Sequence, residues 1–207
     1  YTGGLALYYD KDFAETDPDK TYEALEDLLP EGTAVLEKSA AEDKDSIVVT
    51  RETAEGKSLK TMDDLSEVAG ELTLGAPSEF KTRSQGIPGL KESYGIEFKT
   101  FRPLKAGQAT SGALKNGQID AANIFSTDPS IAANDFVVLE DTKKLFGSQN
   151  VVPLVRSDVQ EEVQSSLDEV SAKLTTDKLA ELLKRTDIDK EDPDQVAADF
   201  LKEEGLD

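Results

Sequence analysis

Small polar side chains gather where an apolar segment ends near the middle of the chain. Residues 119–125 are mostly apolar, as expected for a buried strand, and Ser126, Thr127 and Asp128 follow at once. Open α/β sheets bind small ligands at such strand ends with backbone N–H groups and hydroxyls. Thr127 is therefore a candidate ligand contact, with a simple turn hydroxyl as the alternative. Asp128 precedes Pro129 and is predicted to cap a helix.

Two amide side chains stand at the start of another apolar segment. Gln149 and Asn150 precede residues 151–155, which are predicted to form a strand. Buried amides need hydrogen-bond partners, and a small polar molecule can supply them. The two polar clusters together predict a site for a small polar ligand.

A short run of charges precedes the β-branched residues 46–50. Lys44 and Asp45 belong to this run. A solvated turn is the preferred interpretation of such a run, and a place in the ligand site is the alternative.

The composition limits the chemistry that these residues can perform. The 207 residues contain no histidine and no cysteine, which excludes the commonest general base, thiolate metal ligands and cysteine nucleophiles. No metal and no cofactor are predicted. Residues 187–192 hint at a calcium loop, but the mid-loop glycine is missing, so a turn followed by a helix cap is preferred.

The charge is strongly one-sided. A net charge of −20 repels phosphate groups, so nucleic acids and anionic membranes are disfavoured as partners. No apolar run approaches the ~20 residues that a membrane-spanning helix needs.

Strand and helix patterns alternate through the centre of the chain, and only helix patterns follow residue 155. Asp-Pro pairs at 17–18, 128–129 and 192–193 predict helix starts. The predicted strands are residues 34–36, 46–50, 72–75, 98–101, 119–125, 136–139 and 151–155. The alternation predicts an α/β fold with a mainly parallel sheet covered on both faces. Strands 46–50 and 151–155 are expected to cross between two lobes and act as a hinge.

Seven segments resemble, in the same order, parts of the substrate-binding proteins of osmoprotectant ABC transporters. That family binds glycine betaine, choline, carnitine and proline betaine. The resemblance is carried by residues 41–50, 74–83, 86–91, 114–120, 125–129, 136–141 and 150–153. It implies a two-lobe periplasmic-binding-protein-like fold of type II.

The resemblance also implies the domain bounds. Residues 1–49 and 150–207 would form the first lobe and residues 50–149 the second. The first lobe is expected to be incomplete, because Tyr1 and its two neighbours match a segment that lies well inside the chains of the family.

Ligand-binding residues follow from the same resemblance. Arg83 matches an arginine that contacts the ligand carboxylate, and Tyr1 and Phe125 match two side chains of an aromatic cage around the quaternary ammonium. The positions at Asp45 and Gln149 are not aromatic, so the cage is half present. The predicted ligand-binding set is Tyr1, Thr2, Lys44, Asp45, Arg83, Phe125, Thr127, Gln149 and Asn150.

The resemblance implies a solute-binding subunit without catalytic activity. It would lie outside the cytoplasm, in the periplasm or lipid-anchored at the outer face of the cell membrane, and deliver a quaternary amine or zwitterion to ABC permease subunits. A receptor or effector-sensing domain for a different small polar ligand is one alternative. An enzyme that uses paired carboxylates is another, although no such pair stands at a predicted strand end.

Overall fold

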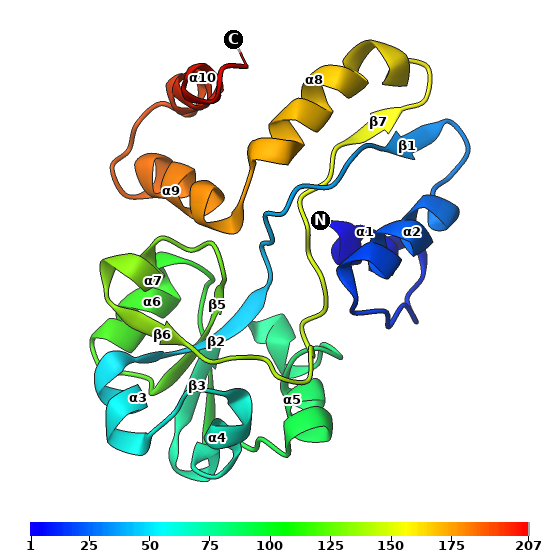
Figure 1. The fold of residues 1–207 in the computed structure, drawn as a ribbon. Helices are drawn as coiled ribbons and strands as arrows, with labels where there is room; N and C mark the ends of the chain where they lie inside the picture. Colours follow the sequence, from blue (N-terminus) through cyan, green and yellow to red (C-terminus); the bar gives the residue numbers. More distant parts are fainter. Residues whose placement is uncertain (207) are drawn as a thin grey trace. The chain divides into compact units, whose positions relative to one another are not determined.

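The computed structural model describes residues 1–206 and divides into two compact units. Unit 1 combines Tyr1–Lys44 with the chain from Gly147 onward, and unit 2 is Asp45–Phe146 (Figure 1). The boundaries expected from the sequence lay at 49/50 and 149/150. Residues 45–49 fall in unit 2 because they form a strand in the middle of its sheet.

Unit 2 is built on a sheet with the strand order β4-β3-β5-β2-β6. Its strands are β2 (Asp45–Thr50), β3 (Thr73–Ala76), β4 (Thr100–Pro103), β5 (Ala121–Phe125) and β6 (Phe136–Val138). Strand β3 pairs in parallel with β4 and β5, whereas β2 runs antiparallel to both β5 and β6. The sheet is therefore mixed: β2 opposes its neighbours in an otherwise parallel arrangement.

Helices cover both faces of this sheet. The helices of unit 2 are α3 (Arg51–Lys57), α4 (Met62–Ser66), η1 (Ala69–Glu71), η2 (Ser78–Lys81), α5 (Ile87–Tyr94), α6 (Gln108–Lys115) and α7 (Ser130–Ala133). Successive residues of β2 point to opposite faces. Ile47 and Val49 pack in a core with residues of α3, α4 and α5, while Val48 packs with α6. The predicted α/β class is confirmed.

Unit 1 contains a small antiparallel pair and five helices within the described residues. Strands β1 (Thr33–Val35) and β7 (Leu154–Arg156) pair with each other. The helices are α1 (Thr2–Tyr9), α2 (Pro18–Leu28), α8 (Gln160–Lys173), α9 (Thr176–Asp187) and α10 (Pro193–Glu204). Ala6, Leu25 and Val35 form a buried cluster that joins α1, α2 and β1.

The predicted pair of strands crossing between lobes is not observed. Strand β2 pairs only within unit 2, and β7 pairs with β1 inside unit 1, over the part of the chain that the structure describes. The residues just before β7 do not belong to the strand. The Val151 N–H donates to the Ala41 carbonyl, and Pro153 has no N–H to donate. The predicted strand 151–155 therefore shortens and shifts to Leu154–Arg156.

The Asp-Pro pairs begin helices. Asp17 and Asp192 accept hydrogen bonds from the first-turn N–H groups of α2 and α10. Asp128 accepts from the Ser130 N–H at 2.8 Å, at the start of the short helix α7. These bonds replace partners that a helix N-terminus otherwise lacks.

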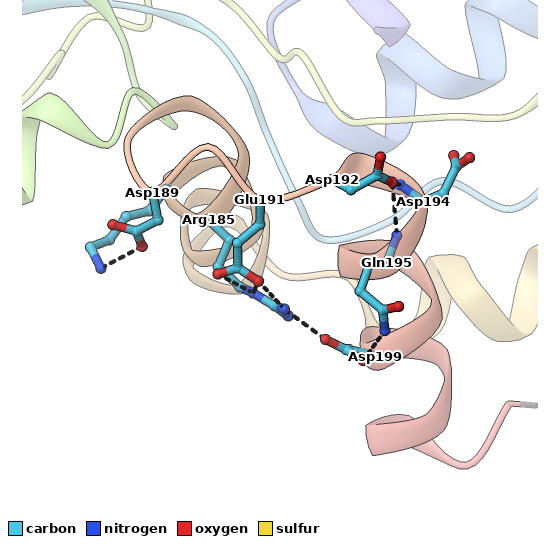
Figure 2. A network of polar contacts seen from close by, with 8 residues as sticks. Arg185, Asp189, Glu191, Asp192, Asp194, Gln195 and Asp199 are labelled. Carbon is cyan, nitrogen blue, oxygen red and sulfur yellow. Dashed lines mark hydrogen bonds and ion pairs between the residues drawn. The ribbon is translucent and has the colours of Figure 1, made fainter.

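The acidic turn between α9 and α10 binds basic side chains (Figure 2). Arg185 contacts Glu191 and Asp199, at 2.5 and 2.6 Å from Nη2, and Lys184 pairs with Asp189 at 3.2 Å. Within the described residues, no cluster of three or more acidic, histidine or cysteine side chains is arranged to hold a metal ion. The turn and helix cap preferred from the sequence are confirmed.

None of the helices in residues 1–206 is long and apolar enough to span a membrane.

Candidate functional site

A buried carboxylate organises one polar cluster in unit 2. Asp45 begins β2, and its side chain is only 10% exposed. Its Oδ2 atom accepts a hydrogen bond from Arg83 Nη2 at 2.5 Å, and its Oδ1 atom accepts one from Asn123 Nδ2 at 2.9 Å. Both carboxylate oxygens thus have a donor, which offsets the cost of burying the charge.

Arg83 is fixed from two directions. It follows η2, where its backbone N–H donates to the Glu79 carbonyl at 2.9 Å. Its guanidinium carbon lies 5.4 Å from the centre of the buried Phe80 ring, a cation–π contact. The side chain remains 39% exposed, so a ligand can reach it. Its Nε and Nη1 atoms have no hydrogen-bond acceptor among residues 1–206.

An exposed aromatic ring stands next to this cluster. Phe125 ends β5 and is 42% exposed, so its ring is open to a ligand. It is the register partner of Asp45. Opposite residues of an antiparallel pair project from the same face of the sheet, and Asn123, two residues earlier, shares that face. The Phe125 ring, the Asp45 carboxylate and the Asn123 amide therefore lie on the same face of the sheet, near the end of β5.

Thr127, one of the polar residues after β5, is packed rather than open. Thr127 is only 2% exposed, at the turn that leads to α7. The Asp128 N–H donates to the Phe125 carbonyl at 3.0 Å, which closes this turn.

Tyr1 is the exposed aromatic residue of the predicted set in unit 1. It is 54% exposed. Partial burial raises the pKa of its phenol to about 12, and a hydrogen bond to Asp43 and the charge of that carboxylate act in the same direction. The phenol is therefore a neutral hydrogen-bond donor at physiological pH.

Thr2 and Asn150 lie together in the interior of unit 1. Thr2 is fully buried, and its hydroxyl accepts from the Asn150 N–H at 3.1 Å. The Asn150 side chain accepts from Ser148 Oγ at 2.7 Å and donates to the Ser39 carbonyl at 2.9 Å. These bonds satisfy both side chains from within unit 1, so they anchor the start of α1.

The side chain of Gln149 also fixes the first turn of α1. Its Oε1 atom accepts from the Gly4 N–H at 2.8 Å. Gly3 lies so close to this segment that a Cβ atom would come within 2.4 Å of the Ser148 carbonyl oxygen, so only glycine fits. Glu42 accepts from the Gln149 N–H at 3.3 Å and from Lys44 Nζ at 3.0 Å.

The structure thus groups the predicted residues within each unit. Asp45, Arg83 and Phe125 lie together in unit 2, and Thr2, Gln149 and Asn150 lie together in unit 1. Sequence reasoning missed Asn123, although a polar residue two positions before Phe125 in an apolar strand marks the same face.

Comparison with known proteins gives the family. The substrate binding domain of ABC-type glycine betaine transport systems matches residues 1–203. The chain belongs to this family. Members are binding domains rather than enzymes, so the expected lack of catalytic activity agrees with the family.

Two relatives and one solved structure illustrate the match. The carnitine transport binding protein OpuCC of Listeria monocytogenes is 30% identical over 159 residues, which cover 75% of this chain and 51% of the relative. The glycine-betaine-binding protein of Pseudomonas aeruginosa is 28% identical over 221 aligned positions, covering 100% of this chain and 71% of the relative. The chain spans about half the length of the Listeria relative.

The solved structure is that of a glycine betaine/carnitine/choline ABC transporter protein. Its TM-score is 0.89 at 27% identity, and the match covers 100% of this chain and 77% of the other. The two-lobe binding-protein fold expected from the sequence is therefore confirmed.

Proposed function

We propose that this chain is the solute-binding part of an ABC importer for a small quaternary amine or zwitterion. The match of a glycine betaine binding-domain family to residues 1–203 carries the proposal. The relatives named for carnitine and glycine betaine support this ligand class.

The unit 2 cluster supports the same ligand class. A quaternary ammonium has no N–H to donate, so it is recognised by aromatic faces and negative charge. Phe125 offers the exposed ring, and Asp45 the nearby charge. Arg83 offers unused N–H groups to a ligand carboxylate.

The predicted residues in unit 1 take two roles in this proposal. Tyr1 contributes an exposed ring and a neutral phenol to the ligand. Thr2, Asn150 and Thr127 are buried and position their own segments, while Gln149 and Lys44 are half-buried at the surface of unit 1.

We place the protein outside the cytoplasm, either in the periplasm or attached to the outer face of the cell membrane, and expect ABC permease subunits as partners. The description of the family as part of a transport system supports both points.

Calorimetric titration of the complete protein tests the proposal. The ligands are glycine betaine, choline, carnitine, proline betaine and proline. Saturable binding of at least one, in the micromolar range, is the expected result. Glycine is the control, because it keeps the carboxylate but lacks the N-methyl groups. Heats no larger than dilution for all five ligands would place the solute in another chemical class.

A further inference from the structure

The ion pair between Asp45 and Arg83 puts a carboxylate of the protein where a ligand carboxylate is proposed to bind. Asp45 Oδ2 lies 2.5 Å from Arg83 Nη2. A charge-assisted contact of this length is the kind of bond that a bound betaine carboxylate would make. The Asp45 carboxylate therefore occupies the position on Arg83 that the carboxylate of a zwitterionic ligand would take.

This internal carboxylate is held in place rather than free to swing away. Asp45 is the first residue of β2 and pairs there with Phe125 of β5, while the pairing of β2 with β6 begins at Val48. Its Oδ1 atom is bound by Asn123, which also donates to the Ser46 carbonyl at 3.3 Å. The next residue, Ser46, is tied to the Ile124 carbonyl at 2.5 Å. Displacing the Asp45 side chain would leave a largely buried carboxylate and a buried amide without these partners.

The charges of the cluster then decide which ligands it favours. Asp45 neutralises Arg83, so the pair presents no net positive charge to an incoming anion. A ligand carboxylate that bound the remaining N–H groups of Arg83 would sit close to the Asp45 carboxylate, where like charges repel strongly. A cation meets the opposite situation, because the Asp45 carboxylate and the negative face of the Phe125 ring both attract it.

We propose that Asp45 makes this binding protein selective for quaternary ammonium cations that lack a carboxylate, such as choline, over zwitterions such as glycine betaine. The proposal rests on the proposed function and narrows its ligand class. Asp45 acts as a specificity-determining residue through its charge and through its hold on Arg83.

The test compares choline with glycine betaine, which share the trimethylammonium group and differ in the group at the other end. In the complete wild-type protein, choline should bind at least tenfold more tightly in calorimetric titration. Asp45→Asn removes the charge at nearly constant shape. This variant should bind glycine betaine at least tenfold more tightly than the wild type does, and choline at least threefold more weakly.

Asp135→Asn is the matched control. Asp135 also pairs with an arginine of unit 2, Arg51, but both side chains are more than half exposed. Its backbone has φ 53°, which asparagine adopts readily. This variant should leave both affinities unchanged.

The outcomes separate the two proposals. Tighter binding of glycine betaine than choline by the wild type overturns the role of Asp45 while leaving the importer function intact. Equal losses for both ligands in Asp45→Asn also overturn it. No binding of either ligand by the wild type overturns the role of Asp45, whereas the importer function falls only if carnitine, proline betaine and proline also fail to bind. The wild-type affinity ratio stands as a test even if the Asp45→Asn protein does not fold.

Discussion

At the scale of single residues, contacts within unit 2 hold the Arg83 side chain in position without a ligand. The guanidinium lies over Phe80 and is bonded to Asp45, so its position is set by the protein. A fixed side chain loses little conformational freedom when a ligand binds, and this favours affinity.

In the Asp45→Asn protein, where no carboxylate of the protein neutralises Arg83, replacing Arg83 by alanine should weaken binding of carnitine or glycine betaine at least tenfold. The loss corresponds to a charge-assisted hydrogen bond of about 1.5–3 kcal/mol. Calorimetric titration of the complete protein measures it. Arg51→Ala is the control, because Arg51 forms an exposed ion pair with Asp135 in the same unit. An unchanged affinity in Arg83→Ala would remove Arg83 from the site.

Replacing Phe125 by alanine should cost choline about 1 kcal/mol of binding free energy, or about fivefold in affinity. Ethanolamine, a primary amine of similar size, should lose less, because its N–H groups can find other acceptors. Val138→Ala, at another partly exposed apolar residue of the same sheet, serves as the control. Equal losses for the two amines would show that Phe125 contributes packing alone.

The sequence indicated Arg83 and Phe125 but not the bond between Asp45 and Arg83. Asp45 and Arg83 are 38 positions apart, and their contact depends on the fold that brings the end of η2 close to the start of β2. Short-range patterns carry no information about such a pairing. The charge run around Asp45 was interpreted first as a solvated turn, because burial of an acid depends on partners from distant segments.

At the scale of elements, capping and core patterns identified most helices and strands. Two α-helices were missed. Helix α3 buries only Ala54 and has no apolar stripe; it is defined by the Thr50 cap and by the left-handed Ser58 that ends it. Helix α1 contains two glycines near its start, and its position depends on the distant segment 148–150.

Asp192→Ala should lower the free energy of unfolding of unit 1 by about 1 kcal/mol. The Asp192 carboxylate accepts the Asp194 and Gln195 N–H groups that begin α10 (Figure 2), and alanine cannot. Urea unfolding followed by circular dichroism measures the change. Asp194→Ala alters a neighbouring acid in the same helical turn but removes no such cap, so its effect should be smaller. Equal effects would show that charge near the helix end matters more than capping.

At the scale of the whole molecule, buried phenols make stability sensitive to alkali. Burial raises the pKa of Tyr94 to about 12, and its bond to Asp141 adds to the effect. Burial likewise raises the pKa of Tyr22 to about 12. An unfolded tyrosine has a pKa of about 10. Between these values the unfolded chain releases protons that the folded chain keeps.

The free energy of unfolding should therefore be constant with respect to these groups below pH ~10 and fall between pH ~10 and ~12. Tyr94→Phe should reduce that fall by about 1–2 kcal/mol, although it also removes a hydrogen bond and lowers stability at neutral pH. Chemical unfolding at a series of pH values measures the slope. Tyr8→Phe, at a residue 76% exposed, is the control. An identical slope in Tyr94→Phe would contradict the assignment.

The insertion of unit 2 within unit 1 has a consequence for synthesis on the ribosome. Every strand of the unit 2 sheet lies between Asp45 and Val138, so the sheet can close while the last third of the chain is still unmade. Strand β1 emerges early, but its partner β7 begins only at Leu154. The segment that contains β1 must therefore remain an unpaired, partly apolar stretch while all of unit 2 is made, which is the stage when a holding chaperone is most useful.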